Sequence, residues 1–331
     1  MSRPRMASLS LDVDDLWTYL KTHGDPSWSS RPSYLDRFIP RALEALERNR
    51  LSCTFFLVGT DAERLAGTSL LRSLTDAGHS VGNHSFEHEP WLHLYSERQL
   101  ESDITRADEA IRVATGQRPK GFRGPGFSWS PALLELLASM GYRYDASTFP
   151  TFLGPVARSY YFWTARLSRE EREQRRALFG SFREGFRPNR PYRWVLPGGR
   201  ELLEIPVTTI PLVKIPFHLS YLLYLSRWSE ALMMLHLRTA LRACRLGGVE
   251  PSLLLHPLDL LGGDEVPSLG FFPGMDLSSR EKSRRFDRVM HAVKEALTVV
   301  DLDTHATSIL REGHLRTVRP ATVTHRVPQE A

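Results

Sequence analysis

His84 and His88 lie four residues apart, just after a short apolar run, and their spacing suits metal chemistry. Neutral imidazole is the commonest protein ligand for zinc and similar ions, and two rings at this spacing can point from one turn of chain toward a single ion. Isolated histidine pairs of this kind are also common as surface or packing residues. The pair alone therefore leaves both a metal site and an ordinary structural role open.

A cluster of carboxylates lies near the N-terminus, where Asp12, Asp14 and Asp15 follow an apolar run at residues 7–11. Carboxylates at the end of a strand can bind a metal or accept a proton. The structural alternative is a solvated turn whose aspartates cap a helix. Because the histidine pair occurs in the same chain, the cluster favours a metal site.

The elements that must position these residues follow an alternating pattern. Short apolar runs alternate with longer segments of helical period, which predicts βα units around a parallel sheet or barrel. Ser130 and Pro131 suit the N-cap and first position of a helix, and Gly141 suits its end. We expect strands at 7–12, 52–58, 79–84, 120–123, 142–146, 202–207 and 251–256, helices at 34–50, 96–115, 130–141 and about 278–300, and a strand-like piece at 305–310.

Two further segments with potentially catalytic side chains follow predicted strands. Residues 121–127 read Gly-Phe-Arg-Gly-Pro-Gly-Phe, and residues 253–257 read Leu-Leu-Leu-His-Pro. Active sites of parallel βα folds assemble where the strands end. We therefore expect Arg123 and His256 to lie near the acidic cluster and the histidine pair.

Composition limits the class of protein. With 331 residues and 41% hydrophobic content, the chain can bury one large core or two ordinary ones. The formal charge of +5 suits an anionic surface or ligand, or simply a solvated surface, and is low for a nucleic-acid binder. Because Cys53 and Cys244 are the two cysteines, neither a disulfide scaffold nor a thiolate metal site is expected.

Residues 152–200 interrupt the alternation. The aromatic run at 160–163 and the charged helical run at 169–176 suit either a solvated helix or a flap over the active site. The apolar run at 211–225 is shorter than the roughly 20 residues needed to cross a bilayer. We predict one domain over residues 1–318, with an insertion at about 152–200, an apolar and basic segment at about 208–245, and a disordered tail at 319–331.

The acidic cluster, the histidine pair and the segments at 121–127 and 253–257 follow one another along the chain as motifs do in the polysaccharide deacetylases, carbohydrate esterase family 4. The sequence resembles this family. The resemblance covers about residues 7–150 and resumes near 202–310, with the insertion unmatched. Residues 84–88 have the family's form of histidine, serine or threonine, two variable residues and histidine. Further resemblances to family motifs lie at 54–59, 78–83, 144–147 and 255–257.

The resemblance implies an α/β fold, a distorted (β/α) barrel with an inserted helical and aromatic segment. It also implies that Asp12 is the catalytic base and that Asp14, His84 and His88 bind the metal. The spacing of the two aspartates is similar to that of an intracellular branch with allantoinase-like and peptidoglycan deacetylase-like members. Asp15 stays open as the alternative ligand, because the more usual family form has two adjacent aspartates.

The resemblance implies roles for the other site residues as well. His256 would protonate the departing amine, Asp145 would orient His256, and Arg123 would fix the base. The family's third motif offers an aromatic residue after its proline, where this sequence has Gly126. The residues expected to bind the substrate or its oxyanion are Gly126, Phe127 and Trp17.

The implied activity is metal-dependent hydrolysis of an N-acetyl or N-formyl group on an amino sugar, in a lipid-linked or nucleotide-linked intermediate of cell-envelope polysaccharide synthesis. We expect a divalent metal, zinc first, with nickel, cobalt and iron as alternatives. One rival is an allantoinase-like hydrolase of a cyclic or linear amide. Another is an inactive carbohydrate-binding relative, which should have lost the metal ligands.

The partners expected are an amino sugar or small amide and no nucleic acid, and the sequence does not indicate an oligomeric state. Residues 1–6 lead directly into the first predicted strand and leave no room for the apolar part of a signal peptide, so we expect a cytoplasmic protein. Residues 211–225, with arginines nearby, could either contact an anionic membrane surface at its inner face or pack against the barrel.

Overall fold

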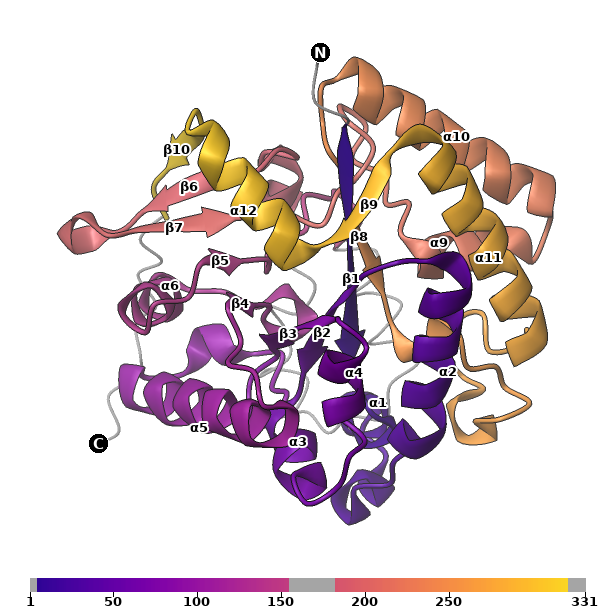
Figure 1. The fold of residues 1–331 in the computed structure, drawn as a ribbon, viewed down its shortest axis with the longest axis horizontal. Coiled ribbons are helices and arrows are strands. Elements are labelled where there is room, and N and C mark those ends of the chain that lie inside the picture. The colour runs from indigo at the N-terminus through magenta and orange to yellow at the C-terminus, as the bar shows by residue number, and fades with distance from the viewer. Residues whose placement is uncertain (1–4, 155–181, 321–331) are drawn as a thin grey trace.

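The computed structural model describes residues 5–154 and 182–320, and its strands form one mixed sheet (Figure 1). Along the sheet the order is β10-β6-β7-β5-β4-β3-β2-β1-β8, with β9 pairing with β1. The pairs are parallel except β6 with β7. The strands are β1 (Met6–Val13), β2 (Thr54–Leu57), β3 (Ser80–Asn83), β4 (Gly121–Phe122), β5 (Tyr144–Asp145), β6 (Tyr192–Val195), β7 (Glu201–Glu204), β8 (Ser252–Leu255), β9 (Thr298–Asp301) and β10 (Arg316–Val318).

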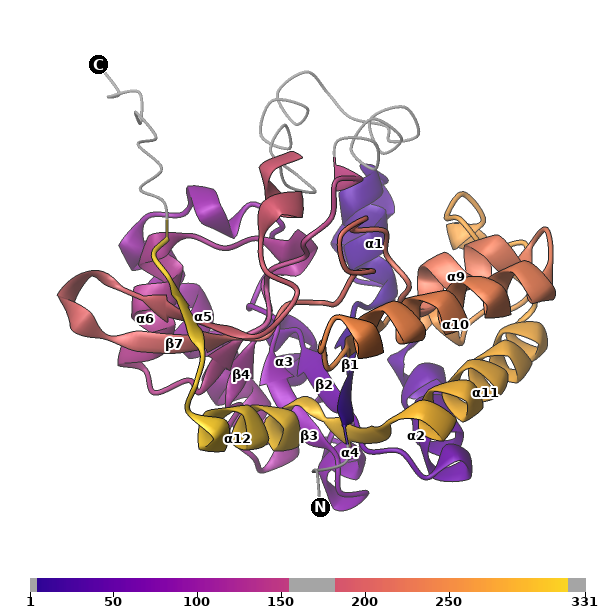
Figure 2. The same ribbon diagram turned by 90° about the horizontal axis from the view of Figure 1, so that it is seen from above.

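Amphipathic helices cover this sheet. Helices α2 and α11 pack beside each other on one flank, and α3 packs against α5 on another (Figures 1 and 2). Burial of each Phe, Leu or Ile side chain on their inner faces stabilises the folded state by about 1.5–3 kcal/mol relative to an exposed side chain. The helices are α1 (Leu16–His23), α2 (Leu35–Asn49), α3 (Gly59–Leu65), α4 (Arg72–Asp76), α5 (Glu97–Thr115), α6 (Pro131–Ser139), α9 (Leu219–Ser226), α10 (Glu230–Leu246), α11 (Ser279–Ala296) and α12 (Leu302–Glu312).

The predicted α/β class with a parallel sheet is confirmed. The predicted strands correspond to β1, β2, β3, β4, β5, β7 and β8, and the predicted helices at 34–50, 96–115 and 130–141 correspond to α2, α5 and α6. In the described part of the chain, the strand pairings trace an open path from β10 to β8.

The C-terminal region corrects two predictions. The helix expected at about 278–300 ends at Ala296, because residues 298–301 form β9 and pair with β1. Residues 305–310, expected to be strand-like, lie inside α12. The side chain of Asp301 accepts a hydrogen bond from the backbone N–H of Thr304 and so starts α12 directly after β9.

The predicted insertion is described only in part. The aromatic run at 160–163 and the charged run at 169–176 lie outside the described residues, as does the chain beyond residue 320. Residues 182–204 contribute β6 and β7, of which β6 was not expected, and the 208–245 segment contains α9 and α10. None of the described helices has both the length and the apolar character needed to span a bilayer.

Candidate active site

The side chains singled out by the sequence lie at the carboxyl edge of the sheet. Val13, Asn83 and Phe122 lie in one row across β1 to β4. The residue that follows each of them is Asp14, His84 or Arg123, so these three lie side by side at the ends of the strands. On the other side of β1, Leu11 pairs with Leu255 of β8, so the next residues, Asp12 and His256, lie opposite each other. Residues far apart in the sequence therefore meet at one edge.

Asp14, His84 and His88 form a compact group of potential metal ligands. Their ligand atoms all lie within 4.8 Å of one another. The Oδ1 atom of Asp14 lies 3.3 Å from Nε2 of His84 and 3.0 Å from Nε2 of His88. Two imidazoles and one carboxylate are a donor set that suits a catalytic divalent ion, because they leave coordination positions for water and substrate.

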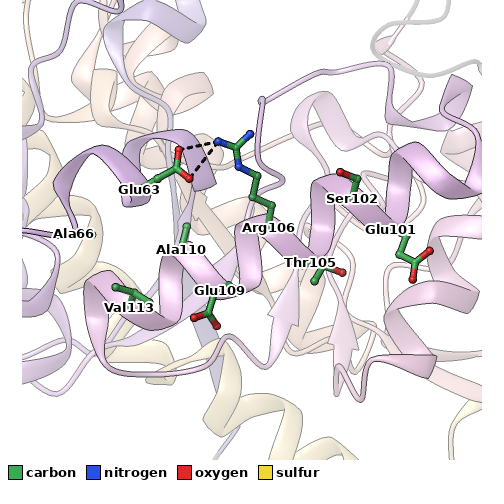
Figure 3. A pocket seen from close by; sticks show the side chains of 9 residues that line it. All are labelled: Glu63, Ala66, Glu101, Ser102, Thr105, Arg106, Glu109, Ala110 and Val113. Carbon is green, nitrogen blue, oxygen red and sulfur yellow. Dashed lines mark hydrogen bonds and ion pairs between the residues drawn. The ribbon is translucent and has the colours of Figure 1, made fainter.

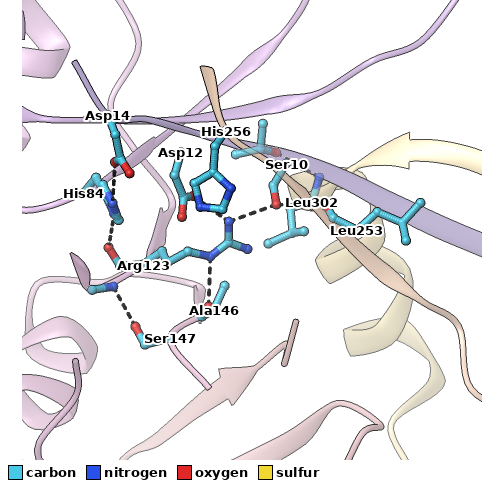
Figure 4. A network of polar contacts seen from close by, with 12 residues as sticks. Ser10, Asp12, Asp14, His84, Arg123, Ala146, Ser147, Leu253, His256 and Leu302 are labelled. Carbon is cyan, nitrogen blue, oxygen red and sulfur yellow. Dashed lines mark hydrogen bonds and ion pairs between the residues drawn. The ribbon is translucent and has the colours of Figure 1, made fainter. Parts of the chain in front are cut away.

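The ring of His84 is oriented by a backbone carbonyl (Figure 4). Its Nδ1 lies 2.6 Å from the carbonyl oxygen of Arg123, so Nδ1–H is the donor and Nε2 is directed to Asp14 as a free ligand atom. Burial opposes the charged form of His84, yet the nearby Asp12 and Asp14 carboxylates raise its pKa. Burial likewise opposes the charged form of Asp14, but His88 and His84 hold its pKa well below the usual range.

The loop that carries both histidines is held in a conformation that few residues adopt. Ser85 and His88 have φ values of 63° and 51°, in the left-handed region, which costs of order 1–3 kcal/mol per residue. The Ser85 hydroxyl accepts the backbone N–H of His88 at 3.1 Å, and the Asp103 carboxylate accepts the N–H groups of Phe86 and Glu87 at 2.8 and 3.2 Å. Burial raises the pKa of Asp103 to about 6 despite these hydrogen bonds.

Asp103 was missed by the sequence reasoning. It lies on the inner face of α5, between the buried Leu100 and Ala107, and is itself buried. A carboxylate on the apolar stripe of an amphipathic helix is the signal that could have identified it.

Asp12 is held by Arg123 (Figure 4). Nη1 of Arg123 donates to Oδ1 of Asp12 at 2.6 Å and to the Ser10 hydroxyl at 3.0 Å, while Nε donates to the carbonyl oxygen of Ala146 at 3.0 Å. The guanidinium also lies over the Phe56 ring, 4.4 Å from its centroid. These contacts point the Asp12 carboxylate along the same edge as the metal ligands.

Asp15, the alternative ligand, lies in a different environment. Its carboxylate caps α1 through the helix's first N–H, accepts the backbone N–H of Tyr34 at 3.0 Å and pairs with Arg64 at 3.1 Å. Burial, together with the charge of Asp61, raises the pKa of Asp15 to about 7. The structure therefore brings Asp14, and not Asp15, into the group with the histidines.

Trp17, expected to contact substrate, is fully buried. Its indole N–H donates to the Asp61 carboxylate at 3.1 Å, and its ring lies edge-on to His88 with centroids 6.5 Å apart. In this structure Trp17 supports the histidine loop from behind instead of presenting a surface to substrate.

His256 does not receive its hydrogen bonds from Asp145. Its Nδ1 lies 3.3 Å from the Ser220 hydroxyl oxygen, and its backbone N–H donates to Oδ2 of Asp259 at 2.9 Å. The sequence reasoning missed both Ser220 and Asp259. Asp259, three residues after His256 across the Pro257 turn, has the spacing of a capping carboxylate and could have been found that way.

Asp145 instead belongs to a buried carboxyl pair. The Ser147 hydroxyl donates to Asp145 and accepts the backbone N–H of Gly124 at 2.8 Å. Burial raises the pKa of Asp145 and of Glu204, and in Glu204 the charge of Asp145 adds to the effect. This pair thus supports the turn that leads to Gly126.

Gly126 and Phe127 form a short turn with unusual backbone angles. Gly126 has a φ of 58°, and a Cβ there would lie 3.0 Å from Cβ of Pro90, so the position favours glycine. Phe127 has a φ of 61°, and its ring packs on Phe149 with centroids 4.8 Å apart. An aromatic side chain is therefore present here, one position later than in the family's third motif.

A surface hollow of about 580 Å³ lies between α3 and α5, away from these residues (Figure 3). Glu63 and Arg106 form an ion pair at its edge, with 2.9 Å between Nη2 and Oε2. Its lining includes none of the metal ligands, Asp12 or His256. We assign the chemistry to the carboxyl edge of the sheet and not to this hollow.

Residues 8–144 match the model of a family described as polysaccharide deacetylase. The chain is 28% identical over 151 residues to the peptidoglycan deacetylase of Helicobacter pylori, covering 44% of this chain and 50% of that protein. It is 32% identical over 105 residues to the chitooligosaccharide deacetylase of Sinorhizobium fredii, covering 31% of this chain and 47% of that protein. The chain thus spans half or less of the length of these curated relatives.

A solved structure of a protein assigned to the polysaccharide deacetylases, from Mycobacterium smegmatis, has the same fold. It superposes with a TM-score of 0.62 at 18% identity, covering 98% of this chain and 96% of that one. At this identity the likeness concerns the fold alone. The family match shows that residues 8–144, which contain Asp12, the three potential metal ligands and Arg123, belong to the polysaccharide deacetylase family.

Proposed function

We propose that this protein is a metal-dependent hydrolase that removes an N-acyl group from an amino sugar. The observation that carries the proposal is the group formed by Asp14, His84 and His88, with ligand atoms within 4.8 Å of one another, next to a carboxylate held by Arg123. An inactive carbohydrate-binding relative has no need for such a ligand group. The names of the relatives from Helicobacter pylori and Sinorhizobium fredii support the deacetylase reading.

Asp14, His84 and His88 would hold a divalent ion, zinc first among the alternatives. Such an ion, when bound, polarises an acyl carbonyl and lowers the pKa of water. The fit is supported by the orientation of His84, whose Nδ1–H donates to a carbonyl and whose Nε2 is directed to Asp14. His88 reaches the same carboxylate oxygen with its Nε2.

Asp12 would act as the general base. Its Oδ1 accepts a hydrogen bond from Arg123, and its Oδ2 would be the atom that takes a proton from the attacking water. The backbone N–H of Gly126 would donate to the developing oxyanion. His256 would then give a proton to the departing amine, which keeps the nitrogen from leaving as an anion.

Within the class of N-acyl amino sugars, we propose that the substrate is lipid-linked, with an acetyl or formyl group, and that the protein works peripherally at the cytoplasmic face of a membrane. The support is an exposed apolar and basic surface, which we call the α10 surface. Its loop residue Leu212 is 91% exposed. The α10 surface consists of the exposed residues Leu212, Val213, Ile215, Leu232, Leu235, Arg238, Arg242, Arg245 and Leu246.

The two parts of the α10 surface lie beside each other. Nε2 of His236, in the middle of α10, lies 3.0 Å from the carbonyl oxygen of Pro216, and a Cβ at Gly247 would meet the Pro211 ring. The loop therefore runs along the helix. Leucines together with arginines on one exposed helix face suit the interface of an anionic bilayer.

The activity is tested by measuring acetate and formate released from a panel of lipid-linked and nucleotide-linked N-acyl amino sugars, with the metal content measured in parallel. Release from an amino sugar is the expected result. Ring opening of a cyclic ureide, with no acid released from any sugar, would instead support an allantoinase-like hydrolase.

The membrane proposal is tested by flotation with vesicles at low salt. The wild type should float with anionic vesicles and stay below with zwitterionic ones, and Leu235→Ser should weaken flotation. Val113→Ser, which changes an exposed apolar residue on α5, serves as the matched control. If the wild type stays in the soluble fraction with anionic vesicles, the peripheral membrane proposal is wrong, whereas the deacylase proposal stands.

A further inference from the structure

Ser220 links the candidate acid His256 to a buried carboxylate. Its hydroxyl oxygen lies 3.3 Å from Nδ1 of His256. It also forms a hydrogen bond with the side chain of Asp259, which is 2% exposed. The three groups therefore form a chain that runs from the imidazole through a hydroxyl to an acid.

The direction of each hydrogen bond follows from the chemistry of the groups. An ionised carboxylate can only accept, so the Ser220 hydroxyl donates to Asp259. The oxygen of Ser220 then accepts from Nδ1–H of His256. As a result Nδ1 carries a proton even in the neutral ring, and Nε2 is the nitrogen that gains and loses the transferable proton.

Asp259 is held firmly enough for this role. Its Oδ2 accepts the backbone N–H of His256 at 2.9 Å. The buried Lys282 donates to the carbonyl oxygens of Leu258 and Leu261, on either side of this turn, at 2.7 and 2.9 Å. Burial raises the pKa of Asp259, and the charge of His256 and the Ser220 hydroxyl offset this rise only in part.

Ser220 is brought to His256 by the start of α9. His218 occupies the N-cap position, and its carbonyl oxygen accepts the N–H groups of Tyr221 and Leu222 at 3.1 and 3.2 Å, which sets the first turn. The buried Leu219 and Leu223 anchor that helix to the core. The helix thus fixes the backbone of Ser220, and one side-chain torsion, χ1, sets the position of the hydroxyl.

We propose that Ser220 is a positioning residue that orients His256 and stabilises its protonated form, using Asp259 as the final acceptor. This rests on the proposed function, in which His256 protonates the departing amine. It assigns to Ser220 and Asp259 the orienting role that the family resemblance gave to Asp145, which in this chain pairs with Ser147 and Glu204. The arrangement follows the general rule that the partner on one ring nitrogen sets the tautomer of the other.

The test compares Ser220→Ala, Ser220→Thr and Ser226→Ala in the metal-loaded full-length protein. Ser226 is a matched control because it is buried on the same helix and its hydroxyl donates to the backbone carbonyl of Leu223. Loss of the acceptor on Nδ1 should lower kcat on the order of tenfold to a hundredfold, with little change in KM. The basic limb of the kcat profile, where the rate falls as the pH rises, should move to lower pH, because the protonated ring loses its hydrogen-bond partner.

Ser220→Thr, which keeps the hydroxyl, should restore the profile, and Ser226→Ala should leave it unchanged. A wild-type kcat and basic limb in Ser220→Ala would overturn the proposal. An equal loss in Ser220→Ala and Ser226→Ala, with no shift of the limb, would also overturn it, since that pattern reports only helix packing.

A second measurement does not depend on turnover. Nitrogen NMR of His256 should give a proton on Nδ1 in the neutral wild-type ring, and a mixture of the two neutral tautomers in Ser220→Ala. A mixed tautomer in the wild type would overturn the positioning role. If the wild type hydrolyses no N-acyl sugar yet shows the Nδ1–H tautomer and its loss in Ser220→Ala, then the proposed function fails and the positioning role stands.

Discussion

Nη1 of Arg123 lies 2.6 Å from Oδ1 of Asp12, and the Arg123 side chain is fully buried. The contact joins the end of β4 to the end of β1, across the two strands that lie between them. The carbonyl oxygen of the same arginine orients His84. Arg123 therefore positions the candidate base through its side chain and a metal ligand through its backbone.

Arg123→Met should destabilise the protein strongly. The change leaves the Asp12 carboxylate buried without its partner, and removal of one member of a buried ion pair typically costs about 3–5 kcal/mol. Urea unfolding measures the loss. The double variant Asp12→Asn with Arg123→Met should recover part of it, because no charge is then left uncompensated. If the double variant loses as much free energy of unfolding as the two single variants lose together, this account is contradicted.

Asp12→Asn should separate metal binding from catalysis. Asp12 lies outside the ligand group, so the variant should bind metal like the wild type. Its rate of deacylation should fall by about 10²- to 10⁴-fold, because asparagine cannot accept the proton of water. Asp36→Asn, on the exposed face of α2, is the control. Retention of full activity in Asp12→Asn would exclude Asp12 as the base.

His88→Ala should lose the metal. With one of three ligands removed, the bound zinc measured by elemental analysis after dialysis should fall well below one ion per chain. The rise in melting temperature that zinc gives the wild type should also become smaller, because a ligand stabilises the folded state by an amount that grows with the ratio of its free concentration to its Kd. His291→Ala is the control, because His291 is an exposed histidine on α11. Equal metal content in His88→Ala and His291→Ala would show that His88 is not a metal ligand.

Much of the fold could be predicted from local patterns in the sequence. The apolar run at residues 7–11 and the amphipathic pattern over residues 34–50 each determine one element, and parallel strands bring their carboxyl ends to one edge. This is why the sequence alone predicts that Asp14, His84, Arg123 and His256 lie close together.

The misses concern partners that are distant in sequence. Thr298 begins a β-branched run that continues the period of a helix, and only its pairing with β1 makes that run a strand. Ser220 is 36 residues before His256, in a segment that reads as an apolar helix, so nothing local marks its hydroxyl as a partner. Asp145 was expected at His256 by resemblance, but the buried Glu204 beside it accounts for its actual environment.

The carboxyl pair of Asp145 and Glu204 should make stability depend on pH. Glu204 accepts hydrogen bonds from Thr148 and from the Trp194 indole, and burial together with the charge of Asp145 raises its pKa well above the ordinary 4.5. Above about pH 4.5 the unfolded chain releases these protons, whereas the folded chain retains them. The folded state then binds more protons, so the free energy of unfolding falls as the pH rises from about 4.5 toward the raised pKa values.

Asp145→Asn should reduce this dependence, while burial keeps the pKa of Glu204 raised. The amide oxygen can still accept from Ser147, and the amide NH₂ can donate to Glu204, so the remaining carboxylate can ionise at a lower cost. The free energy of unfolding is measured with urea between pH 4.5 and 8. In the wild type it should fall by up to about 1.4 kcal/mol per pH unit for each proton that the folded state retains. In Asp145→Asn it should fall less steeply with pH. Asp76→Asn, at an exposed position on α4, is the control. Parallel curves for the wild type and Asp145→Asn would show that Asp145 does not contribute to the pH dependence of stability.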